Sequence, residues 1–176
     1  MSTDVLVSTQ DFLTAGLNPE GVYRMRVKSL GIVERIAQGG RTPGESYKKI
    51  EGQVDLVEKL GDGVLEYPIN AYFSAYTSGR QLAKFRNLYN AKFGSAPQSQ
   101  PGTVSLNDLA SALIGTDDVW CVLYWKRNKN DHDDIREEMG YSFSTDASAI
   151  KAPKPFVQRD VEFKAQTEQF EDEVPY

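Results

Sequence analysis

Basic side chains recur at alternate positions near the start of the sequence, and alternate residues share one face of a β-strand. Arg24, Arg26 and Lys28 are each separated by one residue. At a rise of about 3.3 Å per residue, such cations lie roughly 7 Å apart, which is comparable with the phosphate spacing of a nucleic-acid strand. The other candidate phosphate ligands are Arg41, Lys48, Lys49, Lys126, Arg127 and Lys129.

Tyrosines accompany these cations and supply flat rings on which bases can stack. Tyr72 and Tyr76 lie on an otherwise polar strand face, Tyr47 directly precedes Lys48 and Lys49, and Tyr124 or Trp120 is a further candidate. Two simpler interpretations stay open. A row of charges also occurs on any solvated sheet face, and a single exposed aromatic also packs beneath a loop.

Other chemistries lack their required residues, so we expect no enzyme activity, no cofactor and no metal. One histidine and one cysteine cannot build the usual Cys/His zinc site. The glycine-rich loop at 38–44 lacks the Gly-Lys-Ser/Thr of a phosphate-binding loop, and the acidic run at 131–138 lacks the spacing of a calcium loop. A nuclease assembled from distant carboxylates remains an alternative.

Alternating hydrophobic and polar residues predict the strands that must position these side chains. The first begins at Gly21, has Tyr23, Met25 and Val27 on its core face, and continues over residues 32–36. The second, 47–59, contains Gly52 as a predicted bend. A tight turn at 61–63 then leads into a third strand, 64–77.

Two helices are predicted after these strands, at 78–93 and 106–114, with Ser78 and Ser105 as N-caps. The strongest strand follows at 119–129, and a last one at 139–144. Three strands as a meander, then helices, then one or two strands is the order of an OB-fold. We therefore predict a mainly β chain with α insertions: an OB-fold-like five-stranded Greek-key barrel plus two helices.

The composition fits a soluble globular chain, with 40% hydrophobic and 26% charged residues among 176. No stretch approaches the ~18 apolar residues of a membrane span, and the expected location is the cytoplasm. Residues 1–130 hold 15 Lys/Arg and 13 Asp/Glu, a net of +2, whereas residues 131–176 hold 5 and 12, a net of −7. This asymmetry indicates a mildly basic body with an acidic appendage.

Three segments follow from these patterns. Residues 1–20 form an N-terminal arm, residues 21–145 form the OB-fold-like domain, and residues 146–176 form a flexible linker with a disordered acidic tip. The tip places three carboxylates among apolar anchors, which suits a recognition peptide better than a packed terminus. Its residues are Phe170, Glu171, Asp172, Glu173, Val174, Pro175 and Tyr176.

This ending resembles the C-terminal tip of bacterial and phage single-stranded-DNA-binding proteins, with Val174 and Tyr176 in place of the usual isoleucine and phenylalanine. The body is similar to small phage OB-fold proteins over Gly21 to Val27, Tyr47 to Val54 and Val119 to Arg127. The resemblance implies that the chain binds single-stranded DNA with little sequence preference. It also implies that the tip recruits replication or recombination enzymes, in the host cytoplasm if a phage encodes the chain.

The sequence therefore predicts a protein of DNA replication, recombination and repair whose partners are single-stranded DNA and enzymes bound by the tip. A homo-oligomer is possible, and no membrane is involved. The main alternative is an OB-like protein-interaction or virion-associated module that binds no nucleic acid. Its surface tyrosines would then anchor a protein interface.

Overall fold

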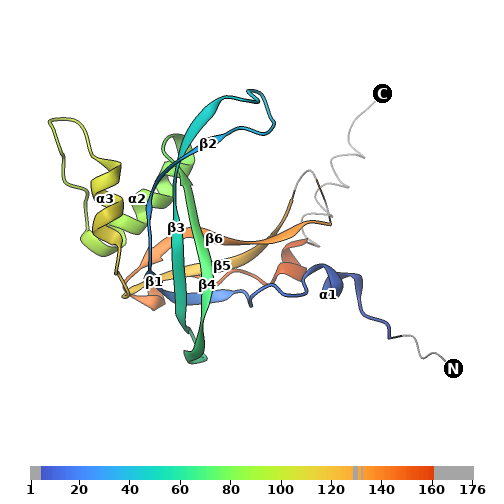
Figure 1. Cartoon of the computed structure of the whole chain (residues 1–176). Helices are drawn as coiled ribbons and strands as arrows, with labels where there is room; N and C mark the ends of the chain where they lie inside the picture. The colour runs from blue at the N-terminus through green and yellow to red at the C-terminus, as the bar shows by residue number, and fades with distance from the viewer. Residues whose placement is uncertain (1–4, 129–130, 132, 161–176) are drawn as a thin grey trace, which may run out of the picture.

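The computed structural model describes residues 5–128, 131 and 133–160, and this part of the chain is mainly β (Figure 1). Six strands form its sheet. They are β1 (Gly21–Val27), β2 (Gly31–Ile36), β3 (Ser46–Lys59), β4 (Gly63–Tyr76), β5 (Val119–Arg127) and β6 (Ile135–Ser144). The helices are α1 (Thr9–Leu13), α2 (Gly79–Phe93), α3 (Leu106–Leu113) and the 3₁₀ turn η1 (Ala147–Ala149).

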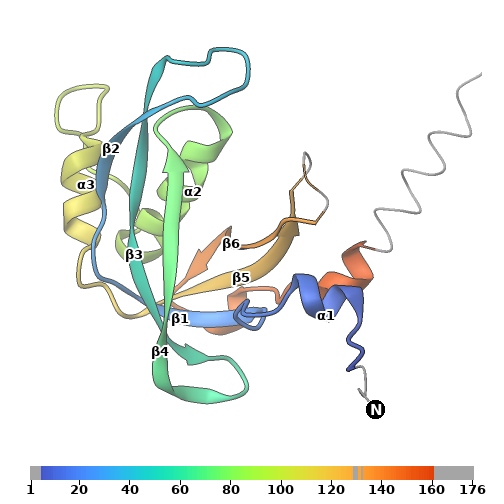
Figure 2. The same ribbon diagram turned by 45° about the vertical axis from the view of Figure 1, so that its right-hand side comes forward.

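All strand pairs are antiparallel, and β3 organises them. Strand β4 pairs along one edge of β3, while β2 and then β1 pair along its other edge. Strand β1 also pairs with β5, which forms a hairpin with β6. Figure 2 shows the β3–β4 and β5–β6 pairs diverging from their junction near β1. The prediction of a mainly β chain with helices after the first strands is confirmed.

The predicted closed barrel of five strands is not confirmed. Residues 21–36, expected as one strand, form two, and no ladder joins β4 to β6 in the part of the chain that the structure describes. The last strand also begins earlier than predicted, at Ile135, so that half of the acidic run lies in β6. The sheet is therefore open between β4 and β6.

Gly52 explains why the first predicted strand divides. The backbone N–H groups of Lys28 and Ser29 both donate to the carbonyl of Gln53, at 2.9 and 3.2 Å, so this turn crosses β3. A Cβ on Gly52 would lie 1.8 Å from the carbonyl oxygen of Ser29. The bend predicted at Gly52 is thus a close approach between backbones, and the register of β3 with β4 shifts further along, between Leu56 and Glu58.

The hydrophobic core lies on the strand faces that alternation predicts. Tyr23, Met25 and Val27 in β1 are at most 1% exposed, and Ile50, Val54, Leu56, Phe73 and Ala75 are fully buried. Tyr67, which alternation places on the core face of β4, is instead 77% exposed, and Leu60 and Val64 beside the β3–β4 turn are 48% and 75% exposed. This end of the hairpin extends past the core.

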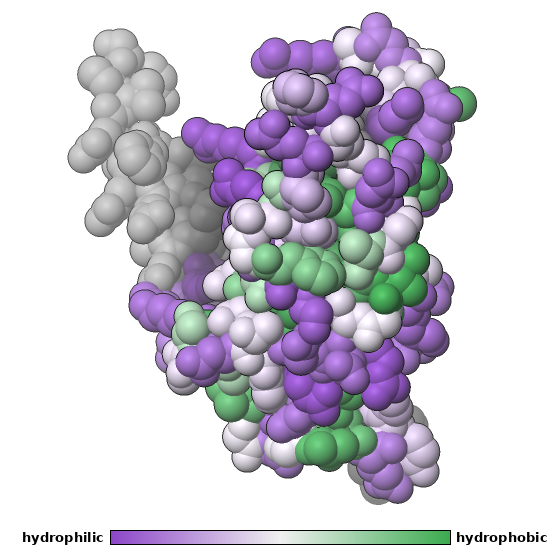
Figure 3. Space-filling view, turned by 90° about the vertical axis from the view of Figure 1, so that its left-hand side faces the viewer, coloured by the Kyte–Doolittle hydropathy of each residue, from purple (hydrophilic) through white to green (hydrophobic). Residues whose placement is uncertain are grey.

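Helix α2 covers the core with Phe85, Leu88 and Tyr89. The hydroxyl of Ser105 caps α3 by accepting from the N–H of Asp108 at 3.3 Å, whereas Ser78 occupies the N-cap of α2 without a side-chain hydrogen bond. Figure 3, seen from the side of α2 and α3, shows a mostly hydrophilic face with small separate hydrophobic patches. No helix within the described residues has the length and apolar character to cross a membrane.

Residues 147–160 pack on the body, although the sequence assigns them to the linker. Ile150 is 6% exposed and contacts Val22 and Val122 on the outer face of β1 and β5. Glu20 accepts hydrogen bonds from the backbone N–H groups of Trp125 at 2.9 Å and Phe156 at 2.7 Å. These contacts place residues 147–160 on the folded body. The remaining residues of the predicted linker and tip, 161–176, lie outside the described residues.

Candidate nucleic-acid interface

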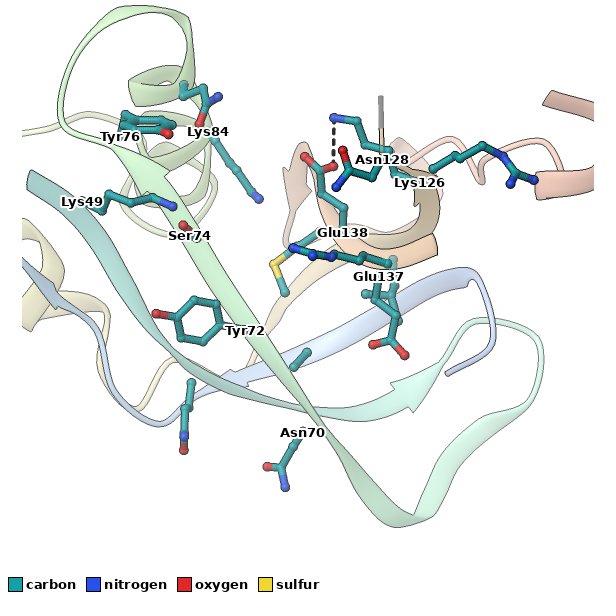
Figure 4. Close-up of a pocket in the computed structure, with 17 residues that line it drawn as sticks. Lys49, Asn70, Tyr72, Ser74, Tyr76, Lys84, Lys126, Asn128, Glu137 and Glu138 are labelled. Carbon is teal, nitrogen blue, oxygen red and sulfur yellow. Dashed lines mark ion pairs between the residues drawn. The ribbon is translucent and has the colours of Figure 1, made fainter. Parts of the chain in front are cut away.

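A groove of about 940 Å³ lies in the open part of the sheet, between the β3–β4 pair and the β5–β6 pair (Figure 4). One wall consists of β3 and β4 residues, the opposite wall of β5 and β6 residues, and α2 contributes at one end. The lining residues are Lys49, Gln53, Asn70, Ala71, Tyr72, Ser74, Tyr76, Gln81, Lys84, Leu123, Lys126, Arg127, Asn128, Arg136, Glu137, Glu138 and Met139.

The groove is basic although the whole chain is acidic. Among the residues that the structure describes, five cations and two carboxylates line it, a net of +3, whereas the full sequence has a net charge of −5. Each of these cations except Lys84 has a carboxylate partner in the described part of the chain: Lys49 lies 3.7 Å from Glu51, Arg127 3.1 Å from Asp160, Arg136 2.7 Å from Asp134, and Lys126 3.1 Å from Glu138, the pair drawn as a dashed line in Figure 4. The more exposed pairs, those of Lys126 and Arg136, contribute little in water, so a bound anion can replace the carboxylate there. The lining can therefore attract a polyanion.

Aromatic rings stand beside these charges on the outer face of β3 and β4. Lys49 is paired with Tyr76 across the two strands, and its Nζ lies 5.0 Å from the centre of the Tyr76 ring. The ring of Tyr47 lies 5.7 Å from that of Tyr76. Tyr72 is 51% exposed and Tyr76 is 38% exposed. The structure thus brings together four predicted site residues, with rings accessible for stacking.

A buried carboxylate holds this face in place. Glu51 accepts from Arg35 Nη2 and from the Tyr72 hydroxyl, both at 2.5 Å, and its side chain is 6% exposed. Burial by itself would raise the pKa of Glu51, but the hydrogen bonds from Arg35 and Tyr72 hold that pKa below its usual value. Burial and the bond to Glu51 raise the pKa of Tyr72. Glu51 is consequently charged at neutral pH and fixes the orientation of the Tyr72 ring.

Replacement of Glu51 by glutamine should lower the free energy of unfolding at pH 7 by about 1–3 kcal/mol, as expected when hydrogen bonds to a charged group are lost. A carboxylate with a lowered folded pKa stabilises the fold above its unfolded pKa and stops doing so as pH falls through the folded pKa. Wild type should therefore lose more stability between pH 7 and pH 3 than Glu51→Gln. Urea unfolding at both pH values measures this difference.

Glu34→Gln is the matched control, because Glu34 is exposed and adjacent to Arg35 on β2. It should match wild type at both pH values. Equal stability of Glu51→Gln and wild type at pH 7, with the same loss on acidification, would refute the role of Glu51.

Several predicted phosphate ligands lie outside the groove. Arg24 is 2.8 Å from Glu58 and Lys28 is 3.7 Å from Asp55, so both are paired on the outer face of β1 and β3. Arg26, Arg41 and Lys48 are exposed but do not line the groove. The predicted stripe of three cations at residues 24–28 is thus a partly ion-paired surface outside the groove. Lys129 and the tip, residues 170–176, lie outside the described residues.

Of the DNA-binding residues predicted on and after β5, two line the groove. Lys126 and Arg127 line the groove, but Arg127 is held 3.1 Å from Asp160 in the C-terminal segment. Tyr124 and Trp120, suggested as stacking residues, pack against the cluster around Ile150 instead. Burial raises the pKa of Tyr124 to about 12, and the Arg159 guanidinium lies 5.4 Å from its ring centre.

Three residues of this region escape prediction from sequence. Arg35 looks like a solvated strand residue; in the ladder it pairs with Tyr47, and only the reach of its side chain brings the guanidinium to Glu51. Lys84 lies in a helix whose cations Arg80 and Arg86 are exposed, and Arg136 lies inside an acidic run. The only signal in the sequence was that α2 carries cations and no acidic residue. Comparison of the chain with protein-family models, with curated proteins and with solved structures gave no match.

Proposed function

We propose that the chain binds single-stranded DNA, with little sequence preference, in the groove between β3–β4 and β5–β6. The observation that carries this proposal is the combination of Tyr72, Tyr76 and Lys49 beside a groove with a net charge of +3. Cations neutralise phosphates whatever the sequence, and every base has a face that can stack on a tyrosine.

The strand pairing supports an OB-like body. If β1 and β2 count as one bent strand, the pairs β1–β3, β3–β4, β1–β5 and β5–β6 correspond to those of a five-stranded OB barrel, and α2 lies between the third and fourth strands. The groove occupies the place of the missing β4–β6 contact. We infer an OB-like barrel left open on the side where the nucleic acid enters.

The role of the C-terminal tip is a second part of the proposal and rests on the sequence alone. Residues 170–176 combine carboxylates with Phe170, Val174 and Tyr176, which suits a basic pocket on a replication or recombination enzyme. The chain would then protect single strands in the cytoplasm, of a host cell if a phage encodes it, and bring such enzymes to them.

Salt dependence of oligo-dT binding tests the groove. Substitution of Lys49 and Lys126 by alanine removes one cation from each wall, and should lower the slope of log K against log salt by about 1.4, or about 0.7 per phosphate contact on a single strand. Fluorescence anisotropy of a labelled oligo-dT at several salt concentrations measures the slope.

Arg26→Ala with Lys28→Ala is the matched control, since it removes two cations that lie outside the groove. This pair should leave the slope close to that of wild type. A larger effect of the Arg26 and Lys28 pair than of the Lys49 and Lys126 pair would place the DNA on β1 instead. Absence of binding at low salt would refute nucleic-acid binding and favour the protein-interaction module.

A further inference from the structure

Lys84 is an unusual residue of the groove because it is a buried lysine. It is 5% exposed, and its Nζ lies 5.3 Å from the centre of the Phe73 ring and 5.9 Å from that of Tyr141. Among the described residues, its ammonium group has no hydrogen-bond or ion-pair partner. Figure 4 shows the side chain pointing from α2 into the space between β4 and the β5–β6 pair. Removing most of the water around a cation that has no anion beside it is costly, and a bound anion would offset that cost.

Other groups that favour an anion surround this position. Ser74 lines the same groove, and its hydroxyl is the single side-chain polar atom within the described residues that is buried with no hydrogen-bond partner. Lys49, which lies 3.7 Å from Glu51, comes from the β3 side, and Lys126, which lies 3.1 Å from Glu138, comes from the β5 side. Figure 4 shows Lys49, Ser74 and Lys84 gathered at the end of the groove nearest α2. Three ammonium groups and a hydroxyl suit a phosphate, which accepts several hydrogen bonds.

We propose that Lys84, Lys49, Lys126 and the Ser74 hydroxyl form an anchor for one phosphate group at the α2 end of the groove. This inference rests on the proposed function in that the phosphate is taken to be a phosphodiester of the bound strand. Bases adjacent to that phosphate would then meet Tyr76 and Tyr72 along β4. The anchor would fix the register of the strand on the tyrosines, whereas the other cations only attract it.

Binding of a phosphate at the anchor should depend on the protonation of Lys84. Burial lowers the pKa of Lys84 to about 8; Lys49 and Lys126 lower it further, whereas Glu138 and Cys121 oppose the shift. The Tyr141 ring and the Phe73 ring complete the surroundings. A bound phosphate would stabilise the ammonium form of Lys84. At a pH above the pKa of Lys84, the free protein must therefore take up a proton on this residue when it binds. Affinity should fall about tenfold from pH 7 to pH 9, since the competent fraction falls by that factor.

The test compares wild type, Lys84→Met, Lys84→Arg and Lys92→Met at pH 7 and pH 9. Anisotropy measures oligo-dT binding, and thermal unfolding with inorganic phosphate measures binding of the free anion. Lys92 is the matched control, because it lies on the same helix and pairs with Asp118 outside the groove. Lys84→Met should stay folded, since methionine keeps the apolar stem and removes a buried charge.

We expect Lys84→Met to weaken oligo-dT binding at pH 7 by about tenfold or more, the loss typical of a hydrogen bond to a charged group. Lys84→Arg should bind with little change between the two pH values, and Lys92→Met should behave as wild type. Phosphate should raise the unfolding temperature of wild type but not of Lys84→Met.

Three other results overturn one claim or both. If Lys84→Met binds oligo-dT and responds to pH as Lys92→Met does, the anchor is refuted while DNA binding stands. If wild type ignores oligo-dT but phosphate stabilises it through Lys84, the anchor stands and the proposed function fails. If neither probe binds wild type, both are refuted.

Discussion

A chain carrying Tyr72→Ala and Tyr76→Ala should bind oligo-dT at least about 30-fold more weakly than wild type. Stacking contributes about 1–3 kcal/mol per base, so two lost platforms give about 2 kcal/mol at the lower limit. Both rings line the groove and are 51% and 38% exposed in the free protein. Neither ring belongs to the core cluster, but the Tyr72 hydroxyl donates to the buried Glu51 carboxylate, so thermal unfolding must first show that the variant is folded before the affinities are compared.

Tyr67→Ala is the control for this pair. Tyr67 lies on the same strand and is 77% exposed, but it does not line the groove. Its removal should leave binding unchanged. Equal affinities for wild type and the double variant, measured at the same salt concentration, would show that the tyrosine face does not contact the bases.

Gly52→Ala should destabilise the fold by about 3 kcal/mol, at the upper end of the range for overpacking. The added Cβ would lie 1.8 Å from the Ser29 carbonyl oxygen and 2.8 Å from the Leu30 Cα, both of which are backbone atoms. The turn at residues 28–30 must move, which breaks the bonds from Lys28 and Ser29 to Gln53. For a chain of this size the melting temperature should fall by about 6–12 °C.

Gly31→Ala provides the comparison, because a Cβ there meets no atom within 4 Å. It should be close to neutral in thermal unfolding. Gly52→Ala should also weaken DNA binding, since the displaced turn leads into β2 and therefore into Arg35, which supports Glu51 and Tyr72. A Gly52→Ala chain as stable as Gly31→Ala would contradict the close approach.

The alternation of hydrophobic and polar residues along the strands predicted side-chain positions best. It places Tyr23, Met25 and Val27 in the core and Tyr47, Lys49, Tyr72 and Tyr76 on the outer face, because a strand has only two faces. Four candidate residues on neighbouring strands therefore reach one surface. Alternation also predicts that Arg24, Arg26 and Lys28 point outward. It cannot predict which carboxylates of the neighbouring strand form ion pairs with them.

The features of the site that the sequence does not predict depend on contacts between distant segments. Glu58 and Asp55 neutralise two of the predicted cations in β1, and they do so through the β1–β3 register. The burial of Lys84 depends on how α2 packs over β4 and β6. The docking of residues 147–160 depends on Glu20, more than a hundred positions earlier in the chain. Neither local composition nor periodicity carries information about such pairings.

Photo-crosslinking of oligo-dT to the full chain, followed by mass spectrometry of the peptides, tests the central claim most directly. Thymine bases stacked in the groove should crosslink to the segment that contains Tyr72 and Tyr76, and to Tyr47, and excess unlabelled oligo-dT should abolish these products. Crosslinks confined to β1 around Arg26, or to α3, would contradict the assignment of the groove as the nucleic-acid site.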